Sequence, residues 1–81
     1  MAGRITELIK DLEEQLEALV IAIPKEEAAH HFYLDLANST KHEGARKMFL
    51  QLAEQELIHK KNLEKVVEDI QKEIAKLKSE R

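Results

Sequence analysis

Glu56 and His59 are the residues of this 81-residue chain whose types and spacing most directly suggest chemistry. In a helix, side chains three residues apart lie on one face, where a carboxylate oxygen and an imidazole nitrogen can converge on a single ion. Glu26, which lies 30 residues before Glu56, is the third candidate. The chain has no cysteine, so any metal must be held by Glu, Asp or His. We therefore predict a metal site that contains Glu26, Glu56 and His59.

A single helix over about residues 5–38 is predicted to carry Glu26. Residues recur at alternating steps of four and three from residue 5, which is the heptad seam of a helix that faces another helix. Pro24 removes a backbone donor and favours a kink. Because the seam keeps its phase across Pro24, we expect one kinked helix rather than two separate ones. The seam residues are Ile5, Ile9, Leu12, Leu16, Leu19, Ile23, Glu26, His30, Tyr33 and Ala37.

A turn is predicted over residues 38–44, where small and polar residues gather. Thr40 and Glu43 have the spacing of a capping box, which opens a helix. A second heptad seam follows and ends in a charged tail after Leu77. Its residues are Ala45, Phe49, Leu52, Glu56, His59, Leu63, Val66, Ile70, Ile74 and Leu77. The predicted fold is thus all-α: one domain, residues 1–81, in which two long antiparallel helices form a hairpin.

The composition excludes several other classes of protein. Ala, Glu, Leu, Lys and Arg supply 46 of the 81 residues, whereas Gly and Pro supply three, so a β-sandwich or a Rossmann domain is excluded. The net charge is −3 with both signs mixed along the chain, so no basic stripe is present and no nucleic acid is expected as a partner. The longest apolar run covers residues 18–23, far short of the about 20 residues that span a membrane. We expect a cytoplasmic protein with no membrane partner and no signal peptide.

Charged side chains in the two seams need an explanation. An ionised carboxylate buried without a partner is strongly unfavourable, and a metal ion would neutralise Glu26 and Glu56. Di-iron carboxylate bundles use a Glu from each of two helices and a Glu-x-x-His pair from each of the other two. One chain supplies half of that set. A homodimer would supply all of it, in a four-helix bundle with the metals on or near the dimer axis.

Two motifs in the chain resemble those of a known family. The first is Glu26-x-x-Ala29-x-x-Phe32-Tyr33, and the second is Phe49-x-x-Leu52-Ala53-x-x-Glu56-x-x-His59. Together they resemble the motif pair of ferritin-like proteins, in the branch of the rubrerythrins and the encapsulated ferritins. The resemblance covers about residues 20–65.

That resemblance implies a di-iron ferroxidase, which oxidises Fe(II) to Fe(III) in iron storage or detoxification. It implies that Glu26, Glu56 and His59 are catalytic residues and iron ligands, and that Tyr33 is a catalytic residue close to the centre. It also implies a homodimer that assembles further into a ring such as a decamer. An encapsulin shell would be a further partner, and the interior of that nanocompartment would be an alternative location.

Two other interpretations remain open at this point. The first is a metal-free coiled-coil interaction module in which polar seam residues fix register and oligomeric state. The second keeps the two-metal centre but uses it to reduce peroxide or oxygen, as a rubrerythrin-like protein would, with manganese as an alternative to iron. Manganese and iron accept the same oxygen and nitrogen ligands, so residue types do not separate them.

Overall fold

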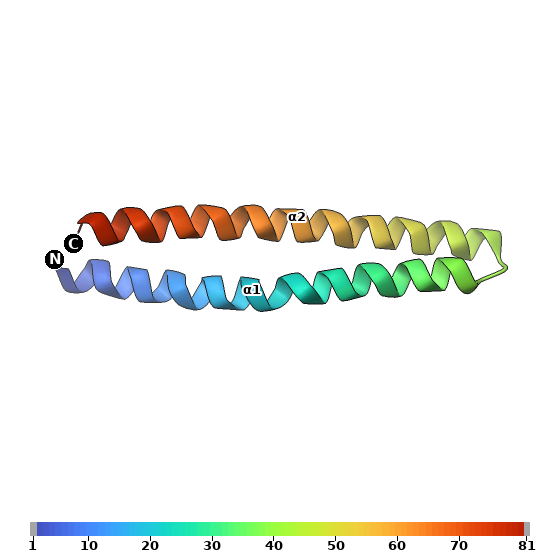
Figure 1. Ribbon diagram of the computed structural model, residues 1–81, viewed down its shortest axis with the longest axis horizontal. Coiled ribbons are helices and arrows are strands. Elements are labelled where there is room, and N and C mark those ends of the chain that lie inside the picture. The colour runs from blue at the N-terminus through green and yellow to red at the C-terminus, as the bar shows by residue number, and fades with distance from the viewer. Residues whose placement is uncertain (1, 81) are drawn as a thin grey trace.

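The computed structural model describes residues 2–80, and it consists of two helices of equal length. α1 spans Ala2–Ser39 and α2 spans Glu43–Glu80, each with 38 residues, and residues 40–42 join them. The helices run antiparallel and form a rod with principal extents of 62, 14 and 12 Å (Figure 1). The predicted all-α hairpin is confirmed. No helix within residues 2–80 is long and apolar enough to cross a membrane.

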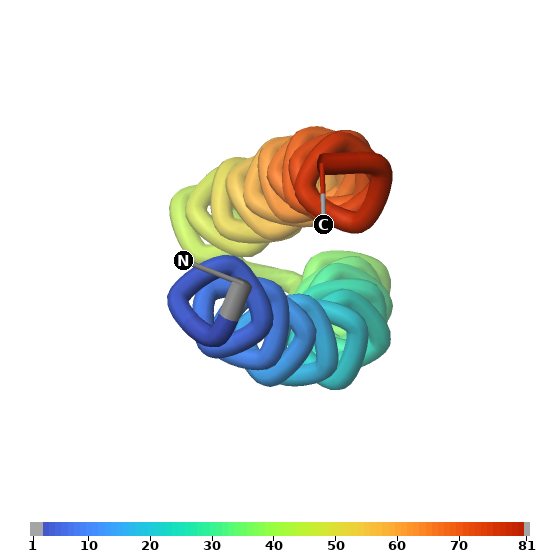
Figure 2. The backbone as a smooth tube through the Cα atoms, turned by 90° about the vertical axis from the view of Figure 1, so that its left-hand side faces the viewer, coloured from blue at the N-terminus to red at the C-terminus, as the bar shows by residue number. Residues whose placement is uncertain are grey.

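The two helices stay side by side along their whole length and wind gently around each other in a left-handed sense (Figure 2). A heptad repeat has 3.5 residues per turn, slightly fewer than the 3.6 of a straight helix, and left-handed supercoiling keeps such a seam in contact. The heptad spacing therefore accounts for the left-handed winding of the two helices.

Pro24 does not interrupt α1, which is a continuous helix on both sides of it, as predicted. The proline side chain is exposed, and Val20, whose carbonyl loses its helical partner, is 52% exposed. Water can therefore reach the region where the backbone hydrogen bond is missing, which keeps the cost of the proline low.

The capping box predicted at Thr40 is wrong, because α2 begins three residues later, at Glu43, and His42 caps it. Nδ1 of His42 accepts a hydrogen bond from the backbone N–H of Ala45 at 3.0 Å, whereas Oγ1 of Thr40 accepts one from the N–H of His42 at 3.2 Å. Gly44 leaves space for the imidazole, since a Cβ there would lie 3.0 Å from Cε1 of His42. A ring nitrogen thus takes the place of a hydroxyl at the helix N-terminus.

The hydrophobic core is thin and is strongest at the end of the rod away from the turn. Ile9, Ile74 and Leu77 are buried there, and partly buried side chains surround them. Toward the turn the buried residues are Ala37 and Ala53, whose small side chains suit closely spaced helices. A core of this size leaves much apolar surface uncovered, as expected for a chain of this length.

The first predicted seam faces α2 as expected, since every one of its residues is buried or half-buried. The second seam requires a correction at two positions. The side chain of His59 is 57% exposed and Val66 is 43% exposed, whereas the neighbouring Ala53, Lys60 and Val67 turn toward α1. The row of apolar residues along α2 is wider than the surface that α1 covers. The spacing of these residues alone therefore does not show which edge of the row faces α1.

The uncovered edge of that row of apolar residues belongs to one continuous side of the hairpin, which we call the open face. Its residues in α2 recur every seven positions, and so do those in α1. Each α1 residue precedes a seam residue by one position, and each α2 residue precedes Ala53, Lys60 or Val67, which face α1. In an antiparallel pair the two rows therefore lie on the same side of the hairpin. The open face consists of Ala22, Ala29 and Leu36 from α1 and Leu52, His59 and Val66 from α2.

Candidate metal centre

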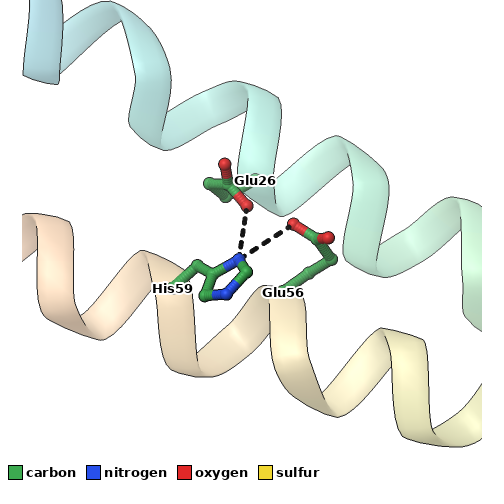
Figure 3. A group of neighbouring side chains, drawn as sticks. All are labelled: Glu26, Glu56 and His59. Carbon is green, nitrogen blue, oxygen red and sulfur yellow. Dashed lines mark ion pairs between the residues drawn. The ribbon is translucent and has the colours of Figure 1, made fainter.

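Glu26, Glu56 and His59 converge near the middle of the rod, where α1 supplies the first and α2 the other two (Figure 3). Glu26 is a seam residue of α1 and points at α2, so its side chain is only 27% exposed. Glu56 points back from α2 and is 19% exposed. His59 lies one turn further along α2, at the edge that belongs to the open face.

The three side chains present their potential ligand atoms to one another. Nδ1 of His59 lies 3.6 Å from Oε2 of Glu26 and 3.8 Å from Oε2 of Glu56. One ligand atom from each residue fits within 4.8 Å of the other two. Two carboxylates and an imidazole are ligands for iron and manganese. The structure therefore brings together the three residues that the sequence spacing selected.

The electrostatics of this cluster favour a cation. Oε2 of Glu26 is buried, and with both carboxyls ionised no hydrogen-bond donor within residues 2–80 reaches it. The pKa of Glu56 is raised above its ordinary value, chiefly because a proton on it is shared with Glu26, and further because of burial and the charge of Glu26. A positive ion would supply what the protein leaves missing, a partner for the buried oxygen and a counter-charge for the carboxylate pair. The residues present thus fit a metal.

An ion pair closes the side of the centre opposite the open face. Nζ of Lys60 donates to Oε1 of Glu27 at 2.8 Å, which links α2 to α1. The hydrogen bond and charge of Lys60 lower the pKa of Glu27, and the hydrogen bond to Glu27 raises the pKa of Lys60. The lysine occupies a core position of α2 that sequence spacing assigned to His59. The sequence does contain a signal for this position, because Lys60 lies seven residues after Ala53 and seven before Val67, in one heptad register.

A second polar contact between the helices lies on the turn side of the centre. Nδ1 of His30 is 2.7 Å from the backbone oxygen of Ala53. The imidazole is half-buried, and its ring meets that of His31 edge-on with centroids 5.5 Å apart. This contact was missed in the sequence because it joins a side chain to a carbonyl, and residue types carry no information about which carbonyl is near.

Tyr33, which the resemblance places close to the centre, lies two turns beyond Glu26 along α1. It is half-buried in the seam, and its ring packs edge-on against Phe32 with centroids 5.5 Å apart. The group of convergent ligand atoms does not include it. In the single chain it is an aromatic seam residue two turns from the ligand group.

Comparison with known proteins identifies the family. A family model described as Rubrerythrin matches residues 17–81, which is most of the chain. The matched segment includes Glu26, Glu56 and His59. No curated protein and no solved structure gives a match. Rubrerythrin-type domains are iron-binding, ferritin-like domains, in agreement with the geometry and the donor set of the centre. The chain therefore belongs to the rubrerythrin family of ferritin-like di-iron proteins.

Proposed function

We propose that the protein is a ferroxidase, which oxidises Fe(II) to Fe(III) at a centre completed by two copies of the chain. The observation that carries the proposal is the convergence of Glu26, Glu56 and His59 in one group of ligand atoms. Three protein ligands from one chain are half of the set of four carboxylates and two imidazoles used by di-iron bundles. A second copy related by a two-fold axis would contribute the same three again.

The open face is the surface on which the second copy would dock. It carries His59, whose side chain is 57% exposed although its Nδ1 points at the carboxylates. It also carries Val66, which is 43% exposed, and half-buried Ala22, Ala29 and Leu52. Alanines allow two hairpins to approach closely, and the branched residues supply apolar area to bury. A partner there would cover apolar surface and complete the ligand set at once.

The roles of the residues follow from their charges. Four carboxylates from two chains would bind two ferrous ions and favour the more highly charged ferric product. His59 would complete the coordination of each ion through a neutral nitrogen. Two ferrous ions release two electrons, which with two protons reduce dioxygen to hydrogen peroxide, or hydrogen peroxide to two waters. Tyr33, two turns away, would act from outside the ligand set in this reaction.

Oxidation and storage are different tasks, and we propose the first. A hairpin 14 by 12 Å across, or a pair of them, encloses no volume for a ferric mineral. Storage would require a shell supplied by another protein or a larger assembly of this one. Detoxification of ferrous iron needs only the centre.

The test is the rate of ferrous oxidation by the purified protein and its variants. Glu56→Ala and His59→Ala should each abolish rapid oxidation, yet leave the helical circular dichroism signal largely unchanged, because apolar seams hold the helices together. His31→Ala is the matched control, since His31 is exposed and lies outside the ligand group. If both site variants oxidise iron as fast as the parent, the centre is not the site of reaction.

The assembly makes a separate prediction. Metal-loaded protein should contain about one iron per chain, and ferrous iron should shift sedimentation toward dimers or larger even-numbered species. A stable monomer that holds two irons would contradict a shared centre. A protein that dimerises equally well without any metal, and binds none, would instead support the metal-free coiled-coil interpretation.

A further inference from the structure

The centre depends on how α1 and α2 are aligned along the axis of the rod. Glu26 comes from one helix, and Glu56 and His59 come from the other, so a shift of one helix along the other would separate them. One residue of a helix rises 1.5 Å, whereas metal–ligand distances in proteins vary by about 0.2 Å. Apolar contacts are non-directional, so apolar seams alone fix this alignment less precisely than a hydrogen bond does.

His30 forms a polar contact that specifies the alignment close to the centre. Its Nδ1 lies 2.7 Å from the oxygen of Ala53, a residue that is 1% exposed. His30 follows Glu26 by four residues, and Ala53 precedes Glu56 by three. The contact therefore ties together the two helical turns next to the carboxylates, on the side that faces the hairpin turn.

The direction of this hydrogen bond follows from the chemistry of its partners. A backbone carbonyl oxygen can only accept, so Nδ1 of His30 must carry the hydrogen. In α2 the same oxygen accepts the helical bond from the amide four residues later, and its second lone pair remains for the imidazole. The neutral ring then has its hydrogen on Nδ1 and a lone pair on Nε2.

We propose that His30 is a positioning residue for the metal centre, which holds α1 and α2 in the register that lets Glu26 meet Glu56 and His59. This inference rests on the proposed function, since it assigns His30 a role at that same centre. His30 is not itself in the group of convergent ligand atoms. The other polar link beside the centre, between Glu27 and Lys60, is more exposed, and exposed ion pairs hold geometry weakly.

Four variants separate this role from mere packing. His30→Leu fills the same seam position with an apolar side chain and removes the hydrogen-bond donor. His30→Asn retains a donor near the position of Nδ1, whereas His30→Gln places its amide near the position of Nε2. His31→Leu is the matched control, because His31 is the exposed neighbour of the same type.

The main measurement is the affinity for Mn(II) or, under anaerobic conditions, for Fe(II), by competition with a chelator. We expect His30→Leu and His30→Gln to bind about 10- to 100-fold more weakly than the parent, as is typical when a residue that orients ligands is lost. His30→Asn should recover most of the affinity, and His31→Leu should match the parent. Metal-free His30→Leu should melt no lower than the parent, which shows that weaker binding does not come from unfolding.

Nitrogen-15 NMR of the metal-free parent gives an independent test of the hydrogen bond. The His30 ring should show hydrogen on Nδ1, whereas exposed histidine rings in water favour hydrogen on Nε2. A His30 ring with hydrogen on Nε2 and none on Nδ1, or a His30→Leu variant that binds metal as tightly as the parent, overturns the inference and leaves the proposed function standing. A parent that binds neither metal overturns both.

Discussion

Replacing Glu26 by Gln tests the carboxylate cluster most sharply, because it changes one charge and few atoms. Without metal, Glu26 and Glu56 face each other, and the pKa of Glu56 is raised by its hydrogen bond to Glu26, by burial and by repulsion. Glutamine removes the repulsion, and its amide can donate to Glu56. We therefore expect metal-free Glu26→Gln to melt at a higher temperature than the metal-free parent.

Metal should reverse this order. A ligand that binds only the folded state stabilises it by about 2.7 kcal/mol at one hundred times its dissociation constant. For 81 residues the unfolding entropy is about 170 cal/mol/K, so the parent should melt roughly 16 °C higher with metal than without it. Glu26→Gln loses a charged ligand, and if its affinity falls about a hundredfold, the same metal concentration adds only about 0.4 kcal/mol, or roughly 2 °C.

The assay is thermal unfolding followed by far-ultraviolet circular dichroism, at one protein concentration and under argon, with and without ferrous iron. Glu27→Gln is the control, because it makes the same chemical change at the adjacent residue, whose partner is Lys60. It should keep the full metal-induced increase. The reasoning is refuted if iron raises the melting temperature of parent and Glu26→Gln equally, or if metal-free Glu26→Gln melts lower than the metal-free parent.

The remaining predictions concern pH, the helix cap and the core. Folding raises the pKa of Glu56 above its ordinary 4.5, so just above pH 4.5 the folded state binds more protons than the unfolded state. The metal-free protein should therefore gain stability as the pH falls from neutral toward about 4.5. Melting curves of parent and Glu56→Gln across this range check it, since only the parent should carry this gain. His42→Ala removes the cap of α2 and should cost about 1 kcal/mol, or roughly 6 °C in the melt. Ile74→Ala opens the buried cluster at the far end and should cost roughly 2–5 kcal/mol in denaturant titrations, whereas exposed Ile21→Ala should cost far less.

The two helices could be predicted because local rules determine them. Heptad spacing marks both helices, and the small polar residues mark the turn. The first seam is correct throughout, because Pro24 lies outside it on the exposed side of α1. The start of α2 was missed because an imidazole, that of His42, can cap a helix as a hydroxyl does.

The ligand group could be predicted in part. Glu56 and His59 share a helix, so their spacing alone shows that they lie on one face. That Glu26 meets them depends on the alignment of two helices, which the ligand count suggested and the structure shows. The exposed position of His59 could not be predicted, because a seven-residue period does not show which edge of a broad apolar stripe is covered. The contact of His30 with Ala53 could not be predicted either, because residue types do not show which backbone carbonyl lies near a side chain.

The hairpin places the start of α1 and the end of α2 at the same end of a rod 62 Å long (Figure 1). This determines what a tandem duplication of the gene would require. If two hairpins pack with their turns at the same end, a few residues suffice to join one copy to the next. If their turns lie at opposite ends, the connection must run the length of the rod, about 18 residues at 3.3–3.6 Å each. Two copies of the chain could be joined by linkers of different length. The shortest linker with which the joined copies still bind metal therefore shows how two hairpins are oriented.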